Sequence, residues 1–412
     1  MKKIIALLLA AVMVVGLAAC GGSGSDTKTV VYWSMWDSTE PQGVAITKAV
    51  EDFTKETGIK VDLQFKGRTG IREGLQPALD AGQVIDVFDE DIDRINTTFA
   101  PYLLDLEELA KKYDYEKTAI AGLIGACREV GGGKLMSIPY QPNIFNFFYN
   151  KGIFEEVGVS EPTTWDELLD VCAKIKAAGY TPITCDDAYI NSMIGYHLGR
   201  LVGAEGVNDI VMNGKWDDPA VKQFAEDYAE LASLGYFSAN IESNVWPAGQ
   251  NQELAGGTAA MYLNGSWLPN EVKNLTAPDF VWGCFAYPAV EGGATGTEAA
   301  SYGAQVFAIN KKTQVADEAF QLINWLTKGE ADLNLSVESI GIPADTTNTE
   351  WPTLLAGVKP VMEKTTTRWA WAAGVENNND VTPAIKENTL KLCGGSITAD
   401  EFVANMLAAA GK

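Results

Sequence analysis

Aromatic and acidic side chains follow two of the short β-like runs near the start of the folded chain. Trp36 and Asp37 come after the run 29–33, and Asp89 and Glu90 come after the third such run. In open α/β sheets, ligands bind at the carboxyl ends of strands. An indole ring there can cover an apolar face of a solute, and a carboxylate can accept hydrogen bonds from its hydroxyl groups. These residues predict non-covalent binding of a small polar molecule.

Each of these residues also has a structural interpretation. Trp36 can belong to the core, and Asp89 and Glu90 can belong to a solvated acidic turn. Arg68, which follows the second β-like run, can form a forked contact with a ligand or with one of these acids, or it can lie on the surface. The sequence leaves these alternatives open.

Metal and cofactor chemistry has little support in the sequence. Asp89, Asp91 and Asp93 are spaced like the start of a calcium loop, but the turn glycine and the glutamate at position twelve are missing. The chain holds 1 histidine, which makes histidine-dependent catalysis or a histidine-rich metal site hard to build. Nucleophile-elbow, zinc-protease and phosphate-loop motifs are also missing. We therefore expect no metal ion and no cofactor.

The elements that would position the candidate residues alternate between β-like runs and helical patterns. This alternation is typical of α/β layering with mostly parallel strands. Strands are predicted over 29–33, 59–65 and 84–88, and apolar spacing predicts helices over 44–57 and 71–81.

Later helices have clear boundary signals. Thr164 and Glu167 have the spacing of a capping box, which predicts a helix that ends at Gly179. Asp218 is a suitable cap for another helix, and a further helix is predicted over 316–328.

The first twenty residues have the layout of a secretory leader. An uncharged apolar run over 4–19 follows a basic start and is short for a membrane-spanning helix, which needs about 20 residues. Its end resembles the lipobox of bacterial lipoproteins, in which the cysteine is acylated. We expect a signal peptide over 1–19 and a flexible tether over 20–28 with lipidated Cys20, which would anchor the protein to the cell membrane outside the cytoplasm. Ordinary secretion is the alternative.

Five further cysteines leave an odd number after Cys20. Cys172 and Cys185 could meet if a helix folds onto the following strand, or both could be small buried residues.

The charge balance limits the partners. Acidic residues number 54 and basic residues 31, for a net charge of −23. Such a field repels phosphate backbones and anionic lipid headgroups. We therefore expect no nucleic-acid partner, and membrane contact only through the lipid.

Four segments carry motifs in a fixed order along the chain. They are YNKGIFEEVG with EPTTWDEL (149–168), GGTAAMYLNGSW (256–267), SYG to AINK (301–311) and SIGIPA (339–344). Together with the lipobox, they resemble the family 1 extracellular solute-binding proteins, the maltose-binding-protein-like receptors of bacterial ABC importers.

This resemblance implies a periplasmic-binding-protein-like α/β fold, with two α/β lobes joined by hinge strands and a ligand cleft between them. It implies a first part of the N-terminal lobe over 29–140, and mainly the C-terminal lobe with hinge crossings over 141–310. C-terminal helices over 311–412 would contribute to both lobes. A ligand that contacts both lobes would favour the closed form, which a permease would recognise.

The resemblance also implies further ligand-binding residues. Trp267 matches a tryptophan that the family places at the cleft, although packing is its alternative role. Tyr140 and Asn143 lie where the family enters its hinge region, and Tyr302 and Trp369, or its neighbour Trp371, are candidates from the second lobe. The expected ligand-binding residues are Trp36, Asp37, Arg68, Asp89, Glu90, Tyr140, Asn143, Trp267, Tyr302 and Trp369.

A sugar has an apolar face of C–H groups and a rim of hydroxyls, so the 11 tryptophans and 14 tyrosines favour carbohydrate. The expected function is capture of a sugar or oligosaccharide by hinge closure and its delivery to an ABC permease, without catalysis. The same hinge could bind a peptide, a polyamine or another polar solute. An extracellular glycoside hydrolase is a further alternative, because acidic residues are numerous, but members of the family bind without turnover.

Overall fold

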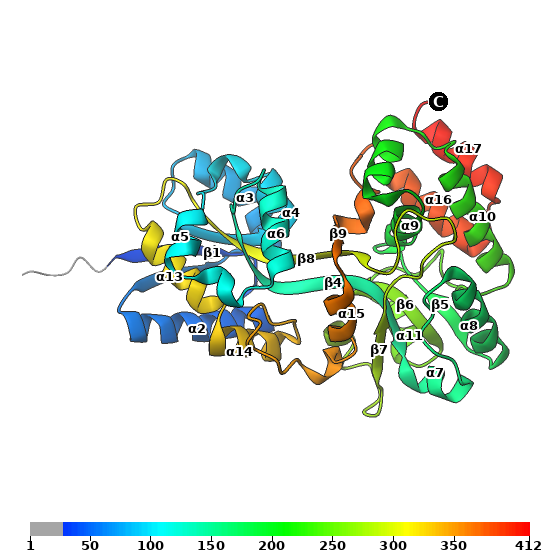
Figure 1. The fold of residues 1–412 in the computed structure, drawn as a ribbon, viewed down its shortest axis with the longest axis horizontal. Helices are drawn as coiled ribbons and strands as arrows, with labels where there is room; N and C mark the ends of the chain where they lie inside the picture. The colour runs from blue at the N-terminus through cyan, green and yellow to red at the C-terminus, as the bar shows by residue number, and fades with distance from the viewer. Residues whose placement is uncertain (1–27) are drawn as a thin grey trace, which may run out of the picture.

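The computed structural model describes residues 28–412, which form two α/β lobes connected by long strands (Figure 1). Each lobe has its own hydrophobic cluster. The first cluster takes buried side chains from 30–140 and 304–335, and we call this part the N-terminal lobe. The second takes them from 144–300 and 342–406, and we call this part the C-terminal lobe. The chain therefore crosses between the lobes more than once.

The expected signal peptide and the lipidated Cys20 lie outside the described residues. Over 28–412, no helix has both the length and the apolar character needed to cross a bilayer.

The N-terminal lobe is an open sheet with helices on its faces. Its strands follow the order β2-β1-β3-β8, in which β1 pairs in parallel with β2 and β3, and β8 (Ala299–Ile309) is antiparallel to β3. The parallel strands are β1 (Thr29–Ser34), β2 (Lys60–Phe65) and β3 (Val87–Asp91). The helices are α2 (Pro41–Thr57), α3 (Gly67–Asp80), α4 (Ile92–Thr97), α5 (Glu107–Lys112), α6 (Ala121–Val130), α13 (Ala316–Leu326) and α14 (Gly329–Ser339). Figure 1 shows α13 and α14 beside α2, so this lobe includes chain from beyond residue 310.

The C-terminal lobe has a smaller sheet and more helices. Strand β6 (Ala259–Gly265) pairs in parallel with β5 (Thr181–Thr184) and antiparallel with β4 (Ile138–Asn150), and β7 (Trp282–Phe285) pairs with the other edge of β4. Short β9 (Thr367–Trp369) pairs with β8. The helices are α7 (Lys151–Val157), α8 (Trp165–Ala177), α9 (Ile190–Asn213), α10 (Pro219–Ser233), α11 (Gly249–Ala255), α12 (Leu268–Glu271), α15 (Lys359–Lys364), α16 (Thr382–Gly394) and α17 (Ala399–Ala409).

Two strands belong to both lobes. Strand β4 (Ile138–Asn150) pairs with β8 (Ala299–Ile309) as far as Ile144, and from Phe145 it pairs with β6 and β7. Strand β8 pairs with β9 at its start and with β3 at its end. One hydrogen-bonded ladder therefore runs from one lobe into the other.

A third crossing follows α14. The carboxylate of Asp332 accepts hydrogen bonds from the backbone N–H groups of Ala344 (2.8 Å) and Asp345 (3.0 Å), and Asp345 accepts one from Gly329 N–H (2.8 Å). These bonds fix the segment to the N-terminal lobe before the chain continues to α15 in the C-terminal lobe.

Several local predictions are confirmed. Thr164 and Glu167 form a complete capping box at the start of α8. Helix α2 ends at Gly58, whose φ of 76° lies in the left-handed region that glycine adopts without steric cost. The pairing of Cys172 and Cys185, which the sequence left open, is also answered, because both residues are buried and free.

The third strand was predicted three residues too early. The prediction placed it over 84–88, but it lies at Val87–Asp91, and Val84 is 68% exposed. Strand pairing with β8 continues as far as Asp91. Asp89 and Glu90 are therefore buried inside a strand, and the interpretation of this segment as a solvated acidic turn is wrong.

The buried position of Asp89 predicts a pH-dependent stability. Burial raises its pKa to about 7, although hydrogen bonds from Tyr140 and from Met35 N–H act in the opposite direction. An unfolded aspartate has a pKa of about 3.9. The protonated carboxyl is thus favoured in the folded state, and its contribution to stability is complete below about pH 4 and lost as the pH rises through about 7.

We expect the free energy of unfolding to fall by at least about 1 kcal/mol more in the wild type than in Asp89→Asn between about pH 5 and pH 8. Urea denaturation at a series of pH values measures this difference. Burial also raises the pKa values of Asp91 and Asp186 to about 6. Both residues are present in both proteins, so their contributions to the pH dependence cancel in the comparison. Identical pH profiles for the two proteins would contradict the prediction.

Candidate ligand-binding cleft

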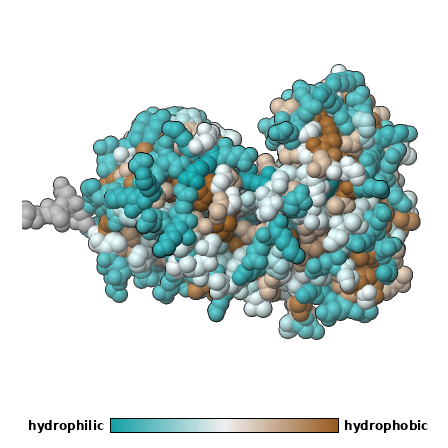
Figure 2. All heavy atoms as spheres, viewed as in Figure 1, coloured by the Kyte–Doolittle hydropathy of each residue, from teal (hydrophilic) through white to brown (hydrophobic). Residues whose placement is uncertain are grey.

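A cavity of about 600 Å³ lies between the two lobes, and we call it the interlobe cavity. The N-terminal lobe contributes residues that follow β1 and begin α2 and α3, and the hinge strands contribute Gln141, Asn143 and Gln305. The C-terminal lobe contributes residues at the starts of α9 and α12. Figure 2 shows the waist between the lobes, where hydrophilic (teal) and intermediate (white) residues cover most of the visible face. A solute in this cavity would contact both lobes.

Trp36 forms an aromatic wall on the N-terminal side. The residue is 5% exposed and lines the cavity, and its indole Nε1 donates a hydrogen bond to the hydroxyl of Tyr140 (2.8 Å). The guanidinium carbon of Arg68 lies 4.6 Å from the centre of this ring. Arg68 also forms an ion pair with Glu40 (2.9 Å), which lines the cavity as well. The hydrogen bond to Tyr140 thus fixes the edge of the indole, and the guanidinium of Arg68 covers one of its faces.

Tyr140 and Asp89 hold Trp36 in place through hydrogen bonds but do not line the cavity. Both are fully buried, and the Tyr140 hydroxyl donates to the Asp89 carboxylate. The Tyr140 ring stacks on Phe307 with centroids 4.1 Å apart. The expectation of direct ligand contact at these two residues is corrected, because the sheet encloses them.

Two more acidic candidates also lie away from the cavity. Glu90 is fully buried, and its carboxylate forms a forked pair with Arg72 (3.0 and 3.1 Å). Asp37 is exposed, but it is not among the residues that line the interlobe cavity. The expected roles of Glu90 and Asp37 as hydroxyl acceptors therefore have no support in this geometry.

Trp267 and Tyr189 form the aromatic wall on the C-terminal side. The Trp267 indole donates to the Tyr189 hydroxyl (3.2 Å), and both residues line the cavity. A Cβ atom at Gly265 would lie 2.3 Å from the Trp267 ring, so the glycine of the GSW motif leaves room for the indole. Asp186 holds the start of α9 by accepting hydrogen bonds from the N–H groups of Ala188 and Tyr189.

A small recess of about 40 Å³ lies beside the hinge strands and shares Asn143 and Trp267 with the interlobe cavity. Tyr302 and Trp371 line it, and the Trp371 ring is inclined by 24° to that of Trp267 at a centroid distance of 6.5 Å. Trp369 borders the recess but is only 2% exposed, because it packs edge-on against the ring of the buried Tyr196. Trp369 is therefore mainly a core residue.

An ion pair joins the lobes at this recess. Arg368 of β9 contacts the carboxylate of Asp93 in α4 at 2.9 and 3.1 Å, and it donates through Nε to the Tyr302 carbonyl (2.9 Å). Asp91 accepts hydrogen bonds from the first N–H groups of α4. The three aspartates of the calcium-like spacing thus have separate partners, and within residues 28–412 no group of three or more metal-ligating side chains is present.

Sequence reasoning missed several residues of the cavity wall. Glu271 follows Trp267 by one helical turn, so helical spacing from the GSW motif could have indicated it. Tyr189, Glu40 and Gln141 had no comparable signal. Gln141 reaches its position through a φ of 45° and donates a hydrogen bond to Ser339 (3.1 Å), and neither feature can be read from residue types.

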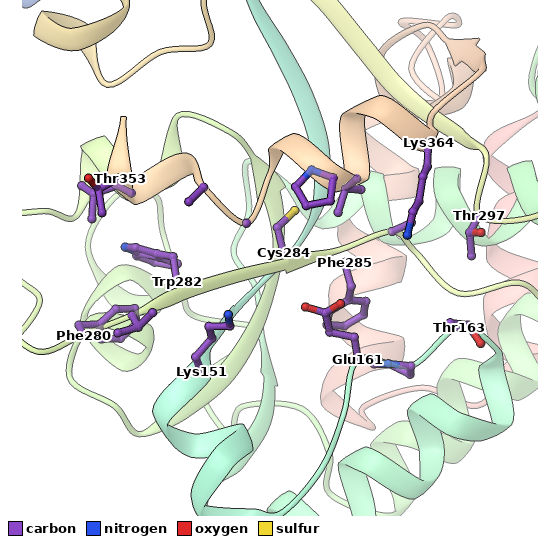
Figure 3. Close-up of a pocket in the computed structure, with 18 of the residues that line it drawn as sticks. Lys151, Glu161, Thr163, Phe280, Trp282, Cys284, Phe285, Thr297, Thr353 and Lys364 are labelled. Carbon is purple, nitrogen blue, oxygen red and sulfur yellow. The ribbon is translucent and has the colours of Figure 1, made fainter. Parts of the chain in front are cut away.

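A larger cavity, of about 780 Å³, lies elsewhere (Figure 3). It is enclosed by the C-terminal lobe alone, between β7 with its preceding loop and the segment that contains α15. Trp282, Phe280 and Phe285 line it, with Lys151 and Lys364 at its edges. Because its walls come from one lobe, a solute bound there would not link the two lobes.

Solved structures with the same architecture include two that cover nearly all of the chain. A probable secreted solute-binding lipoprotein from Streptomyces coelicolor has a TM-score of 0.76 at 15% identity, covering 94% of this chain and 100% of that one. A solute-binding protein solved in complex with raffinose, RafE, has a TM-score of 0.70 at 21% identity, covering 93% and 98%. The expected periplasmic-binding-protein fold is confirmed.

Sequence comparison gives the family. The multiple sugar-binding protein of Streptococcus mutans is 27% identical over 350 residues, which is 80% of this chain and 79% of that protein. Residues 36–332 match the family described as bacterial extracellular solute-binding protein, whose members bind solutes and are not enzymes. The chain therefore belongs to the family of bacterial extracellular solute-binding proteins.

Proposed function

We propose that this protein captures a sugar or short oligosaccharide in the interlobe cavity and delivers it to the permease of an ABC transporter. The observation that carries the proposal is the pair of aromatic walls, with Trp36 on one lobe and Trp267 on the other. Indole rings suit the apolar C–H faces of a sugar. Carboxylate, guanidinium and amide groups of Glu271, Arg68 and Asn143 also line the cavity and suit its hydroxyl rim.

Hinge closure would follow from contacts with both lobes. A ligand must favour the closed form by about 5.5 kcal/mol to shift the equilibrium from 1:99 to 99:1. A micromolar ligand has a binding free energy of about −8 kcal/mol, which is enough if most of the contacts form only on closure. Strands β4 and β8 would transmit the movement, because each is paired within both sheets.

The names of the relatives support carbohydrate as the solute class. The Streptococcus mutans relative is a multiple sugar-binding protein, and one structural relative was solved with raffinose. A cationic solute such as a polyamine is the second candidate, because Glu271 faces the cavity without a cationic partner among the described residues.

Lipid anchoring at Cys20 completes the proposed function. The apolar run before Cys20 and the polar segment 21–28 have the composition of a lipoprotein leader and a flexible tether. Strand β1 begins at Thr29, so the tether would hold the protein by its N-terminal lobe.

Trp267→Ala should weaken sugar binding at least about tenfold, or ~1.4 kcal/mol, because it removes one aromatic wall. A thermal-shift screen with maltotriose, cellotriose, raffinose, stachyose and diacetylchitobiose would identify a ligand, and calorimetry would give its affinity for both proteins. Recovery of the sugar intact after binding would separate the receptor from a hydrolase.

Trp325→Ala is the matched control, because Trp325 is partly buried in α13 and packs on Phe53, away from the cavity. It should lower stability and leave affinity unchanged. Equal affinity of Trp267→Ala and the wild type would assign Trp267 to packing, and a thermal shift with spermidine alone would favour the cationic solute.

Ligand binding should also make the protein more compact. Small-angle scattering should show a smaller radius of gyration when the sugar is present at saturation, because the lobes approach each other around it. An unchanged radius with bound sugar would contradict hinge closure.

A further inference from the structure

Acidic side chains outnumber basic ones on the walls of the cleft. The interlobe cavity is lined by Glu40, Glu271 and Arg68, and the recess is lined by Asp91, Asp93 and Arg368. No other described residue on these walls carries a full charge at neutral pH. The cleft therefore has four carboxyl groups and two guanidinium groups.

Both arginines already have acidic partners. Arg68 pairs with Glu40 (2.9 Å), and Arg368 pairs with Asp93 (2.9 Å) while also donating to the Tyr302 carbonyl. An anionic ligand that approached either arginine would have to share it with the carboxylate already paired there, and the two negative charges would repel each other.

Glu271 has no such partner. Its Oε1 accepts a hydrogen bond from the side-chain amide of Asn251 (2.7 Å), which is 2% exposed, and no ion pair joins it to a lysine or arginine within the described residues. Burial raises the pKa of Glu271, while the side chains of Asn251 and Trp246 act in the opposite direction.

The charge of Glu271 acts on the C-terminal wall of the cavity. Burial is the main reason that the pKa of Tyr189 is raised, and the charge of Glu271 raises it further. Tyr189 is the residue that accepts the hydrogen bond from the Trp267 indole. Glu271, Tyr189 and Trp267 all line the interlobe cavity, so a ligand that rests against these rings shares the cavity with the carboxylate.

We infer that Glu271 makes the cleft selective for charge, so that it accepts saccharides whose polar groups are uncharged and excludes those that carry a carboxylate or phosphate. This inference rests on the proposed function. A hydroxyl can donate a hydrogen bond to the carboxylate, whereas an anionic group is repelled by it, and partial burial reduces the screening by water.

The local effect can be separated from the negative charge of the whole protein. Long-range repulsion of anions by the net charge of −23 falls with ionic strength, because the Debye length is about 3 Å at 1 M salt. Repulsion by a partly buried carboxylate next to the ligand is screened much less. Selectivity that arises at Glu271 should therefore persist at high salt.

The experiment compares each sugar of the screening panel that binds with the same sugar after oxidation of its primary hydroxyls to carboxylates. The wild type should bind the oxidised sugar at least about 100-fold more weakly, at both low and high salt. The carboxamide of the oxidised sugar has a similar shape and no charge, and it should bind within about tenfold of the parent sugar.

Glu271→Gln should reduce the discrimination between parent and oxidised sugar at least about tenfold. Glu205→Gln, on an exposed position of α9, changes the net charge equally and should leave the discrimination unchanged. If Glu271→Gln does not fold, the comparison of carboxylate with carboxamide in the wild type still tests whether the cleft excludes the charge, and Glu271→Asp, which keeps the charge, should keep the discrimination.

Equal binding of parent and oxidised sugar, or equal discrimination by Glu271→Gln and the wild type, would overturn the inference while leaving the proposed function intact. If none of the neutral sugars binds, the proposed function itself fails, and the inference fails with it.

Discussion

The structure depends on two strands that are each hydrogen-bonded into two sheets. Strand β4 pairs with β8 in its first half and with β6 and β7 in its second half. Strand β8 pairs with β9 at its start and with β3 at its end. The shared ladder is irregular where the lobes meet, since the pairing shifts register between Tyr140 and Pro142 and Gln141 has a φ of 45°. Pro142 also lacks an N–H group to donate to the ladder. The lobes are thus linked by continuous strands whose pairing is irregular at the point where the lobes meet.

The same strands connect the core to the cleft. Tyr140 of β4 joins the Trp36 indole to the buried Asp89, and in the C-terminal lobe Asp186 accepts a hydrogen bond from Tyr262 while it holds the start of α9 next to Tyr189. Each aromatic wall is therefore supported by a buried aspartate and tyrosine. Such supports fix the orientation of a wall before a ligand arrives, which reduces the ordering cost of binding.

Much of the fold could be predicted because its signals are local. The capping box at Thr164 and the left-handed glycine at the end of α2 act within a few residues, and the motifs around Tyr149 and Trp267 indicated the family. The acidic segment of β3 was misread, because polar residue types suggest solvent unless their distant partners are known. Arg72 and Tyr140, which allow Glu90 and Asp89 to be buried, lie on other elements.

The candidate site was predictable only in part for the same reason. Trp36, Arg68, Asn143 and Trp267 were named and line the interlobe cavity, whereas Asp89, Glu90 and Tyr140 lie behind its wall. Tyr189 and Glu271 were missed because their roles depend on how the start of α9 and the short helix α12 lie relative to the hinge strands. Sequence indicates which residue types are available, but the packing of the two lobes decides which of them face a ligand.

The segment that follows α14 has a mechanical consequence. Asp332 and Asp345 fasten it to the N-terminal lobe, and it then runs to α15 on the other lobe. With β4 and β8 as the only connections, one lobe could rotate about the strand direction as well as bend toward the other lobe. A third connection, fastened by Asp332 and Asp345, would resist torsion and would limit the separation of the lobes, so that any open state would keep a narrow range of interlobe angles.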